Sequence, residues 1–175
     1  QPIDTTMSFS PTSGIMTSTR SGDLDPSLLF YLHKRGGLSL TLLNQLVNKE
    51  SGLKGVSGLT GDMYKLIQLS KSNSNAKEAI DMYCYQVAKS IGAYSAALGG
   101  LDSLVFSGGI GEKSAHIRQQ ICYNLKFLGI NLNYKANKSN KQQIAKKGSR
   151  VKVYVLETDE SQVIANLVRD KLGLI

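Results

Sequence analysis

The chain is poor in cysteine and has no long apolar run. Its two cysteines, Cys84 and Cys122, form no Cys-x-x-Cys pair, and each lies in a segment with a helical pattern. Both are therefore predicted to be buried, reduced thiols. No apolar stretch approaches the roughly 20 residues that cross a bilayer, so a soluble protein that does not insert into a membrane is expected.

Two further absences concern the start of the chain and its organisation. Residues 1–3 carry neither the basic start nor the apolar stretch of a secretory signal, and they resemble the middle of a longer chain. The sequence contains no internal repeat. Its length of 175 residues fits one domain with a core of its own.

Acidic residues are scarce relative to basic ones, 13 against 21, which gives a formal net charge of +8. Residues 131–150 hold six basic residues and no acidic one. This stretch is predicted to be a solvated polar connection that also raises the electrostatic potential for anionic ligands. Tyr134 is its one aromatic residue, so a base-stacking pattern is missing and no nucleic acid partner is expected.

The hydrophobic periodicity predicts one α/β domain. The clearest helix runs from about residue 76 to residue 98, where apolar residues recur at steps of three and four. Gly99 and Gly100 end it. Short apolar or alternating runs predict strands at residues 103–107 and 151–155.

Shorter elements surround this frame. An Asp-Pro pair predicts a helix that begins at Pro26, and residues 39–50 predict another. Residues 52–61, with a glycine at every third position, are predicted to be a loop that can approach a ligand. Thr158 or Asp159 is expected to cap a last helix. Four apolar residues are expected on the inward face of that helix: Ile164, Leu167, Val168 and Leu172.

Residues 104–112, Leu-Val-Phe-Ser-Gly-Gly-Ile-Gly-Glu, predict a strand, a glycine turn and the start of a helix. Glycines let backbone approach a bulky ligand, and the free N–H groups at a helix start favour an anion. The pattern is neither a phosphate loop of the Gly-x-x-x-x-Gly-Lys-Ser/Thr type nor a Gly-x-Gly-x-x-Gly motif. On spacing alone, an ordinary turn is the alternative.

A second candidate element is residues 19–26, Thr-Arg-Ser-Gly-Asp-Leu-Asp-Pro. The planar fork of Arg20 matches phosphate oxygens, so this loop is suited to clamping a phosphoryl group in transfer. The alternative is a surface ion pair between Arg20 and Asp23 or Asp25.

A third candidate element is the acidic run at residues 157–160, Glu-Thr-Asp-Glu, after the last predicted strand. Carboxylates there can hold Mg²⁺ through one or two oxygens and water. Favourable interaction with the dipole of the following helix explains them equally well.

All these elements occur together in an order that resembles the acetate kinase family. The resemblance is carried by residues 4–11, 19–26, 57–63, 91–94, 100–102, 106–112 and 158–160, and it covers nearly the whole chain. It implies an α/β fold of the actin-like and hexokinase-like ATPase superfamily, namely a ribonuclease-H-like domain with a mixed sheet flanked by helices. Residues 1–175 would be the carboxy-terminal, nucleotide-binding domain of such an enzyme, without its amino-terminal domain.

The resemblance also implies roles for single residues. Arg20 matches the catalytic arginine, Pro11 the proline that lines the acetate pocket, and Glu160 the Mg²⁺-linked glutamate.

Two segments match nucleotide-contacting positions of the family. The first comprises Gly109, Ile110, Gly111, Glu112 and Lys113, and the second comprises Asp62, Met63 and Tyr64. Lys113 and Tyr64 stand where the family usually has an asparagine and an arginine.

The expected function is reversible, Mg²⁺-dependent transfer of a phosphoryl group from ATP to acetate, giving ADP and acetyl phosphate, in a cytoplasmic homodimer. The amino-terminal half would supply another catalytic acid, histidines and most of the acetate pocket. His33 and His116 lie outside the matching blocks and are expected to be structural or exposed. The alternatives are a propionate or butyrate kinase, a non-enzymatic actin-like nucleotide-binding module, and a basic binding domain.

Overall fold

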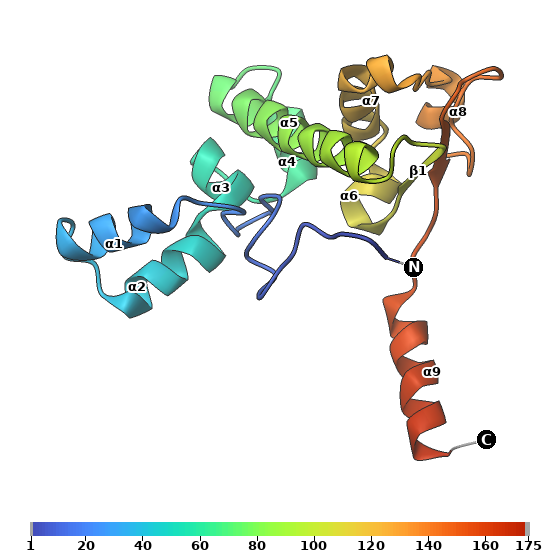
Figure 1. The fold of residues 1–175 in the computed structure, drawn as a ribbon. Helices are drawn as coiled ribbons and strands as arrows, with labels where there is room; N and C mark the ends of the chain where they lie inside the picture. The colour runs from blue at the N-terminus through green and yellow to red at the C-terminus, as the bar shows by residue number, and fades with distance from the viewer. Residues whose placement is uncertain (1, 174–175) are drawn as a thin grey trace.

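A computed structural model of the chain describes residues 2–173, which form a mainly helical α/β fold with a small sheet (Figure 1). The elements in chain order are α1 (Pro26–Lys34), α2 (Leu40–Gln45), the π-helical turn η1 (Leu46–Glu50), α3 (Gly52–Ser57), α4 (Met63–Leu69), α5 (Ser74–Ala97), β1 (Ser103–Phe106), α6 (Gly108–Lys113), α7 (Ala115–Asn124), the 3₁₀ turn η2 (Lys126–Leu128), α8 (Tyr134–Lys138), β2 (Lys152–Val155) and α9 (Glu160–Leu172).

The sheet joins β1 and β2 in parallel, with Ser103 opposite Lys152 and Phe106 opposite Val155. A mixed sheet was expected. Within residues 2–173, antiparallel pairing is limited to two isolated bridges, Leu132 with Ala145 and Gln143 with Tyr154. Because the strands run parallel, α6 and the segment after β2 leave the sheet at the same edge, where ligands of open α/β sheets bind.

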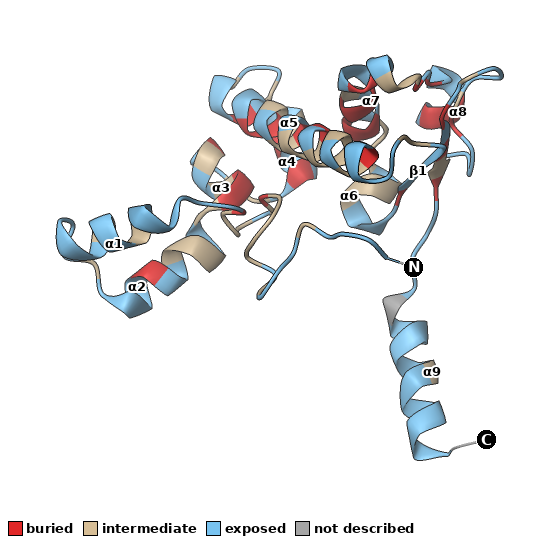
Figure 2. Cartoon of the chain, viewed as in Figure 1, coloured by how far each residue is buried: buried red, intermediate tan, exposed pale blue. Residues whose placement is uncertain are grey.

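The core forms around α5, as the periodicity predicts. Asn73 caps this helix by accepting a hydrogen bond from the N–H of Ala76 at 2.9 Å. Ala76, Ile80 and Cys84 are buried, and α5 packs against α3, α4 and α7. Figure 2 shows buried residues on α3, α4, α5, α7 and α8. Cys84 in α5 and Cys122 in α7 are both buried and free, so the prediction for the thiols is confirmed.

The prediction of a loop at residues 52–61 is wrong for its first half, which forms α3. Leu53 has no exposed surface, and Gly58 ends the helix in the left-handed conformation at φ 65°. Burial of an apolar side chain therefore outweighs the low helix propensity of the glycines.

The basic stretch at residues 131–150 is more than a solvated connection. Its six basic side chains are exposed, as expected. However, Leu132, Ala136, Asn137 and Ile144 are buried, and part of the stretch forms α8. The apolar residues between the lysines fasten the stretch to the core, a pattern that the charge count does not reveal.

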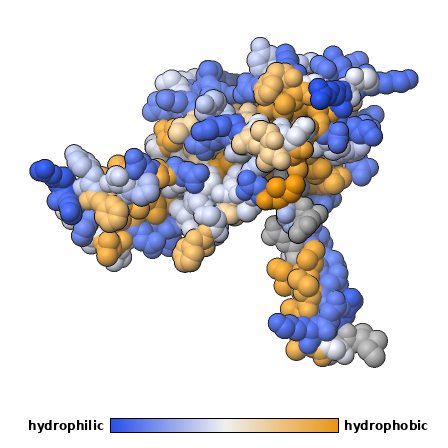
Figure 3. Space-filling view, viewed as in Figure 1, coloured by the Kyte–Doolittle hydropathy of each residue, from blue (hydrophilic) through white to orange (hydrophobic). Residues whose placement is uncertain are grey.

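The last helix begins where it is expected but does not pack as expected. Asp159 caps α9 by accepting a hydrogen bond from the N–H of Gln162 at 2.9 Å. The four apolar residues predicted to face inward are all exposed: Ile164, Leu167, Val168 and Leu172. Figure 1 shows α9 projecting from the rest of the fold, and Figure 3 shows apolar side chains along one side of it. No other described element lies against that side.

Among residues 2–173, no helix combines the length and the apolar composition that crossing a bilayer would need.

Burial raises the pKa of both the Cys84 and the Cys122 thiol to about 12. We expect neither thiol to react with an aromatic disulfide reagent at pH 8 in the folded protein, and both to react in urea, because the reactive species is the thiolate. Full labelling of the native protein at pH 8 would contradict this prediction, and Cys84→Ala should halve the labelling in urea.

The unfolded thiols titrate near pH 8.5, so the stability that they contribute is complete below about pH 8.5 and falls as the pH rises toward 12.

Candidate functional site

Three segments that are far apart in the sequence line one cavity of about 510 Å³. Gly61 to Tyr64 contribute the start of α4, and Gly109, Ile110 and Lys113 contribute α6. Ser18, from the loop that carries Arg20, lies at the same cavity. Its volume falls in the range of roughly 300–1,000 Å³ that is typical of small-molecule sites. The two segments predicted to contact a nucleotide are therefore neighbours in space.

Asp62 fixes the start of α4. Its carboxylate oxygen Oδ1 accepts hydrogen bonds from the N–H groups of Tyr64 at 2.9 Å and Lys65 at 3.3 Å, which makes it the helix cap. Met63 is buried in the core, whereas Tyr64 is 72% exposed. Of these three residues, Tyr64 offers the most side-chain surface to a ligand.

The glycine turn predicted after β1 is instead the short helix α6. Gly108 begins it at φ 69°, and a side chain at Gly109 would meet nothing within 4 Å. Gly111 packs against Phe106 and, unlike Gly109, does not line the cavity. A Cβ atom on Gly108 would also meet nothing within 4 Å, but only Gly109 combines this open space with a place in the lining of the cavity.

Glu112 faces the start of α6 and the segment after β2. Its Oε1 atom accepts hydrogen bonds from the N–H of Gly108 at 2.8 Å and from the N–H and hydroxyl of Thr158 at 2.9 and 3.0 Å. These bonds, first of all the one from the Thr158 backbone, hold the pKa of the Glu112 carboxyl below its usual range. Glu112 therefore joins the glycine helix to the acidic segment.

The loop that carries Arg20 is held by the start of α3. The N–H groups of Leu53 and Lys54 donate to the carbonyl oxygens of Thr17 and Ser18 at 2.9 and 3.0 Å. A Cβ atom on Gly52 would lie 2.2 Å from the Thr17 oxygen, so only glycine allows this approach.

Arg20 lies beside Pro11, so two predicted site residues meet. The Arg20 Nη1 atom donates to the Pro11 carbonyl oxygen at 3.4 Å. Asp23 accepts from the N–H of Gly14, and Asp25 caps α1 through Ser27. In the described part of the chain Arg20 forms no ion pair with either aspartate, and the half-buried guanidinium keeps donors for another ligand.

The acidic segment after β2 contains Glu157, Thr158, Asp159 and Glu160. Asp159 acts as a helix cap, and the side chain of Glu160 lies outside what the structure describes. No group of three or more potential ligand side chains occurs among the described residues. Mg²⁺ that arrives with nucleotide phosphates needs only one or two protein carboxylates, and Glu157 offers an exposed carboxylate at this edge.

The sequence of the chain matches a known protein family. The model of the "Acetokinase family" matches residues 1–166. The chain belongs to the acetokinase family.

Individual acetokinases agree over nearly the whole chain. The acetate kinase of Brachyspira hyodysenteriae is 45% identical over 169 residues, which are 94% of this chain and 42% of that protein. The propionate kinase PduW of Salmonella typhimurium is 43% identical over 164 residues, 93% of this chain and 41% of that protein. The chain thus spans about two fifths of the length of these curated relatives.

Solved acetokinase structures share the fold. The acetate kinase of Porphyromonas gingivalis superposes with a TM-score of 0.87 at 38% identity, over 95% of this chain and 43% of that one. The propionate kinase of Francisella tularensis superposes with a TM-score of 0.88 at 39% identity, over 93% of this chain and 42% of that one. The α/β fold of these kinases is confirmed for this chain, while its finer ribonuclease-H-like assignment stays a prediction.

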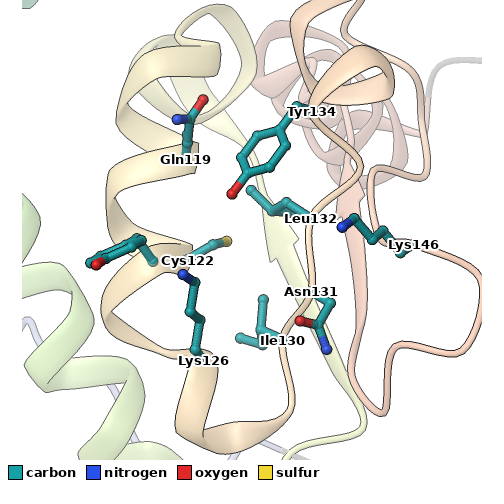
Figure 4. A pocket seen from close by; sticks show the side chains of 9 residues that line it. Gln119, Cys122, Lys126, Ile130, Asn131, Leu132, Tyr134 and Lys146 are labelled. Carbon is teal, nitrogen blue, oxygen red and sulfur yellow. The ribbon is translucent and has the colours of Figure 1, made fainter.

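A separate, smaller cavity of about 160 Å³ lies between α7 and the basic stretch (Figure 4). Lys126 and Lys146 line it, and the Tyr134 hydroxyl points into it. None of the residues that match the acetokinase motifs lines this cavity. His33 and His116 are exposed on helices, as expected for histidines outside the motifs.

Arg118 matches none of the sequence motifs, yet it is fully buried and donates hydrogen bonds to carbonyl oxygens of α6. The available signal was its position in the sequence next to Ile117 and three residues before Ile121, two apolar residues that prove to be buried in the core. An arginine next to a core face indicates a buried network of polar groups, because an unpaired buried charge is too costly.

We predict that Gly109→Ala weakens ADP binding by about tenfold, because a methyl group would occupy space at the cavity. The same change is expected to leave folding intact or to stabilise it by roughly 0.5–1 kcal/mol, since alanine favours a helix over glycine. Calorimetric titration with ADP and thermal unfolding measure the two effects.

Gly92→Ala in α5 is the matched control for this prediction. Its Cβ would also meet nothing within 4 Å, and Gly92 does not line the cavity. Equal ADP affinity in the two variants would remove Gly109 from the binding site.

Proposed function

We propose that this chain is the carboxy-terminal, nucleotide-binding domain of an acetate kinase, which transfers the terminal phosphoryl group of ATP reversibly to acetate. The observation that carries the proposal is the single cavity formed by the start of α4, by α6 and by the Arg20 loop. An ADP or ATP molecule would place its adenosine part in this cavity. Its phosphates would extend toward Arg20 and the acidic segment at the edge of the sheet.

Arg20 is the proposed catalytic residue of this half. The transferred phosphoryl group carries charge on its equatorial oxygens, and a guanidinium fork stabilises that charge without forming a covalent intermediate. The hydrogen bonds from α3 to residues 17 and 18 keep the loop in place before the substrates arrive. Such preorganisation is the main contribution that a protein makes to direct in-line transfer.

Glu160 is the residue proposed to hold Mg²⁺, and Glu112 would keep the neighbouring Thr158 in position. When bound, the ion would supply positive charge to the nucleotide phosphates.

Tyr64 and Lys113 are proposed nucleotide contacts despite their departure from the family pattern. Both line the cavity and both are exposed. An exposed tyrosine ring can stack on an adenine base, and a lysine ammonium can pair with a phosphate. The departures are thus compatible with nucleotide binding through a different set of contacts.

Acetate or acetyl phosphate would contact Pro11, with the rest of the pocket supplied by the amino-terminal half of a longer, cytoplasmic, homodimeric enzyme. Propionate is the alternative acceptor, because propionate kinases are among the similar proteins. The two acceptors differ by one methylene group, and the pocket that would discriminate them lies mostly in that other half.

In a full-length enzyme that carries this sequence, Arg20→Ala is predicted to slow turnover by roughly 10³-fold while nucleotide affinity changes by no more than a few-fold. The reason is that the guanidinium is needed most in the transition state. Arg20→Lys keeps the positive charge but lacks the planar fork, so its turnover number should lie between those of Arg20→Ala and the parent enzyme. Steady-state kinetics with ATP and acetate provide the measurement, and a turnover number within tenfold of the parent enzyme would refute the assignment.

The 175-residue chain alone is predicted to bind ADP weakly and to transfer no phosphoryl group to acetate. Holding an acceptor in line with the phosphorus accounts for ~7 kcal/mol or more of barrier reduction, and Pro11 and Arg20 cannot align two substrates by themselves. Calorimetry with ADP tests binding, and an acetyl-hydroxamate assay with ATP, Mg²⁺ and acetate tests transfer. Absence of ADP binding would contradict the proposed site, and acetate-dependent turnover would contradict the division of roles.

A further inference from the structure

The short helix α6 cannot keep its position by local interactions. It has six residues, and three of them are glycines. Each glycine in a helix costs about 1 kcal/mol relative to alanine, and isolated helices shorter than roughly 12 residues are marginal even with good helix formers. The placement of α6 beside the cavity must therefore come from groups outside it.

The guanidinium group of Arg118, in α7, is one group that holds α6 in place. Its side chain has no exposed surface, and its Nη1 atom donates to the carbonyl oxygens of Gly111 and Glu112, both at 2.7 Å. These carbonyls lie in the last turn of α6, where helix carbonyls lack partners within the helix and where a positive charge is favourable.

The other side of the guanidinium is bound to α8 and the residues after it. Its Nε and Nη2 atoms donate to the side-chain oxygen and the carbonyl oxygen of Asn137 at 2.8 and 2.9 Å, and Nη2 also donates to Oδ1 of Asn140. Asn137 is itself buried and donates to the Ala115 carbonyl oxygen at 2.8 Å. One side chain thus links α6, α7 and α8.

No carboxylate pairs with Arg118 in the described part of the chain. Burying a guanidinium without a counter-ion is expensive unless its donors are all used, and here five hydrogen bonds to neutral acceptors use them. The guanidinium therefore fixes the positions of the five acceptors that it binds relative to one another.

We propose that Arg118 is a positioning residue that holds α6 in the place where Gly109, Ile110 and Lys113 face the cavity. It acts through the carbonyls of Gly111 and Glu112 and does not line the cavity itself. The consequence for ligand binding rests on the proposed nucleotide site, whereas the placement of α6 does not. A lysine cannot replace it, because one ammonium group cannot reach the α6 carbonyls and the α8 acceptors together.

The test compares three variants of the 175-residue chain. Arg118→Lys keeps the charge and removes the fork. Asn140→Gly removes one acceptor of Arg118 and suits the left-handed backbone at that position, where φ is 47°. Gln119→Ala, on the exposed face of α7, is the control. Amide hydrogen exchange of residues 108–114 and calorimetric ADP affinity are measured for each.

Exchange in α6 is expected to be about tenfold faster in Arg118→Lys, with a smaller increase in Asn140→Gly and none in Gln119→Ala, while α5 stays protected. ADP affinity should fall in the same order, by about tenfold for Arg118→Lys. If Arg118→Lys does not fold, Asn140→Gly decides through the same two measurements.

The outcomes separate this inference from the proposed function. Unchanged hydrogen exchange of α6 in both Arg118→Lys and Asn140→Gly would overturn the positioning role, regardless of the ADP affinities of these variants. Faster exchange in a chain whose parent does not bind ADP would support the positioning role and refute the nucleotide site. Faster exchange with unchanged ADP affinity would overturn the claim that the position of α6 matters for binding.

Discussion

Because β1 and β2 pair in parallel, the segments that follow them leave the sheet at one edge, and the candidate site depends on this constraint. The glycine helix α6 follows β1, and the acidic segment follows β2. The Glu112 carboxylate accepts hydrogen bonds from both segments and so links them. An antiparallel arrangement of the same strands would place the two segments at opposite edges and would leave Glu112 without Thr158.

Close approach of backbone to backbone explains several glycines that, on their own, suggest a ligand. A Cβ atom on Gly52 would lie 2.2 Å from the Thr17 oxygen, and one on Gly61 would lie 2.5 Å from the Ser18 oxygen. Both glycines therefore serve the packing of the Arg20 loop against α3 and the start of α4. Gly109 differs from them, since a side chain there would meet no protein atom within 4 Å.

The helices of the chain fall into two groups, those packed in the core and those left largely exposed. α5, α7 and α8 share the buried core, whereas α1 has no buried residue and the apolar side of α9 is exposed (Figure 2). Apolar faces of this kind are usually covered in a stable protein. The curated relatives are more than twice as long as this chain, which spans 42% of the Brachyspira hyodysenteriae acetate kinase.

Local signals in the chain were sufficient to predict several elements. Periodicity located α5 and both strands, Asp159 marked the start of α9, and the ordered motifs identified the family. The contacts between distant residues became visible only in the folded chain: the cavity between α4 and α6, the bonds of Glu112 to Thr158, and the buried contacts of Arg118. It also turned two predicted loops into α3 and α6 and left the apolar face of α9 exposed. The physical reason is that propensity and periodicity report on neighbours in the chain, whereas burial of Leu53 and the hydrogen bonds of Arg118 come from residues elsewhere in the fold.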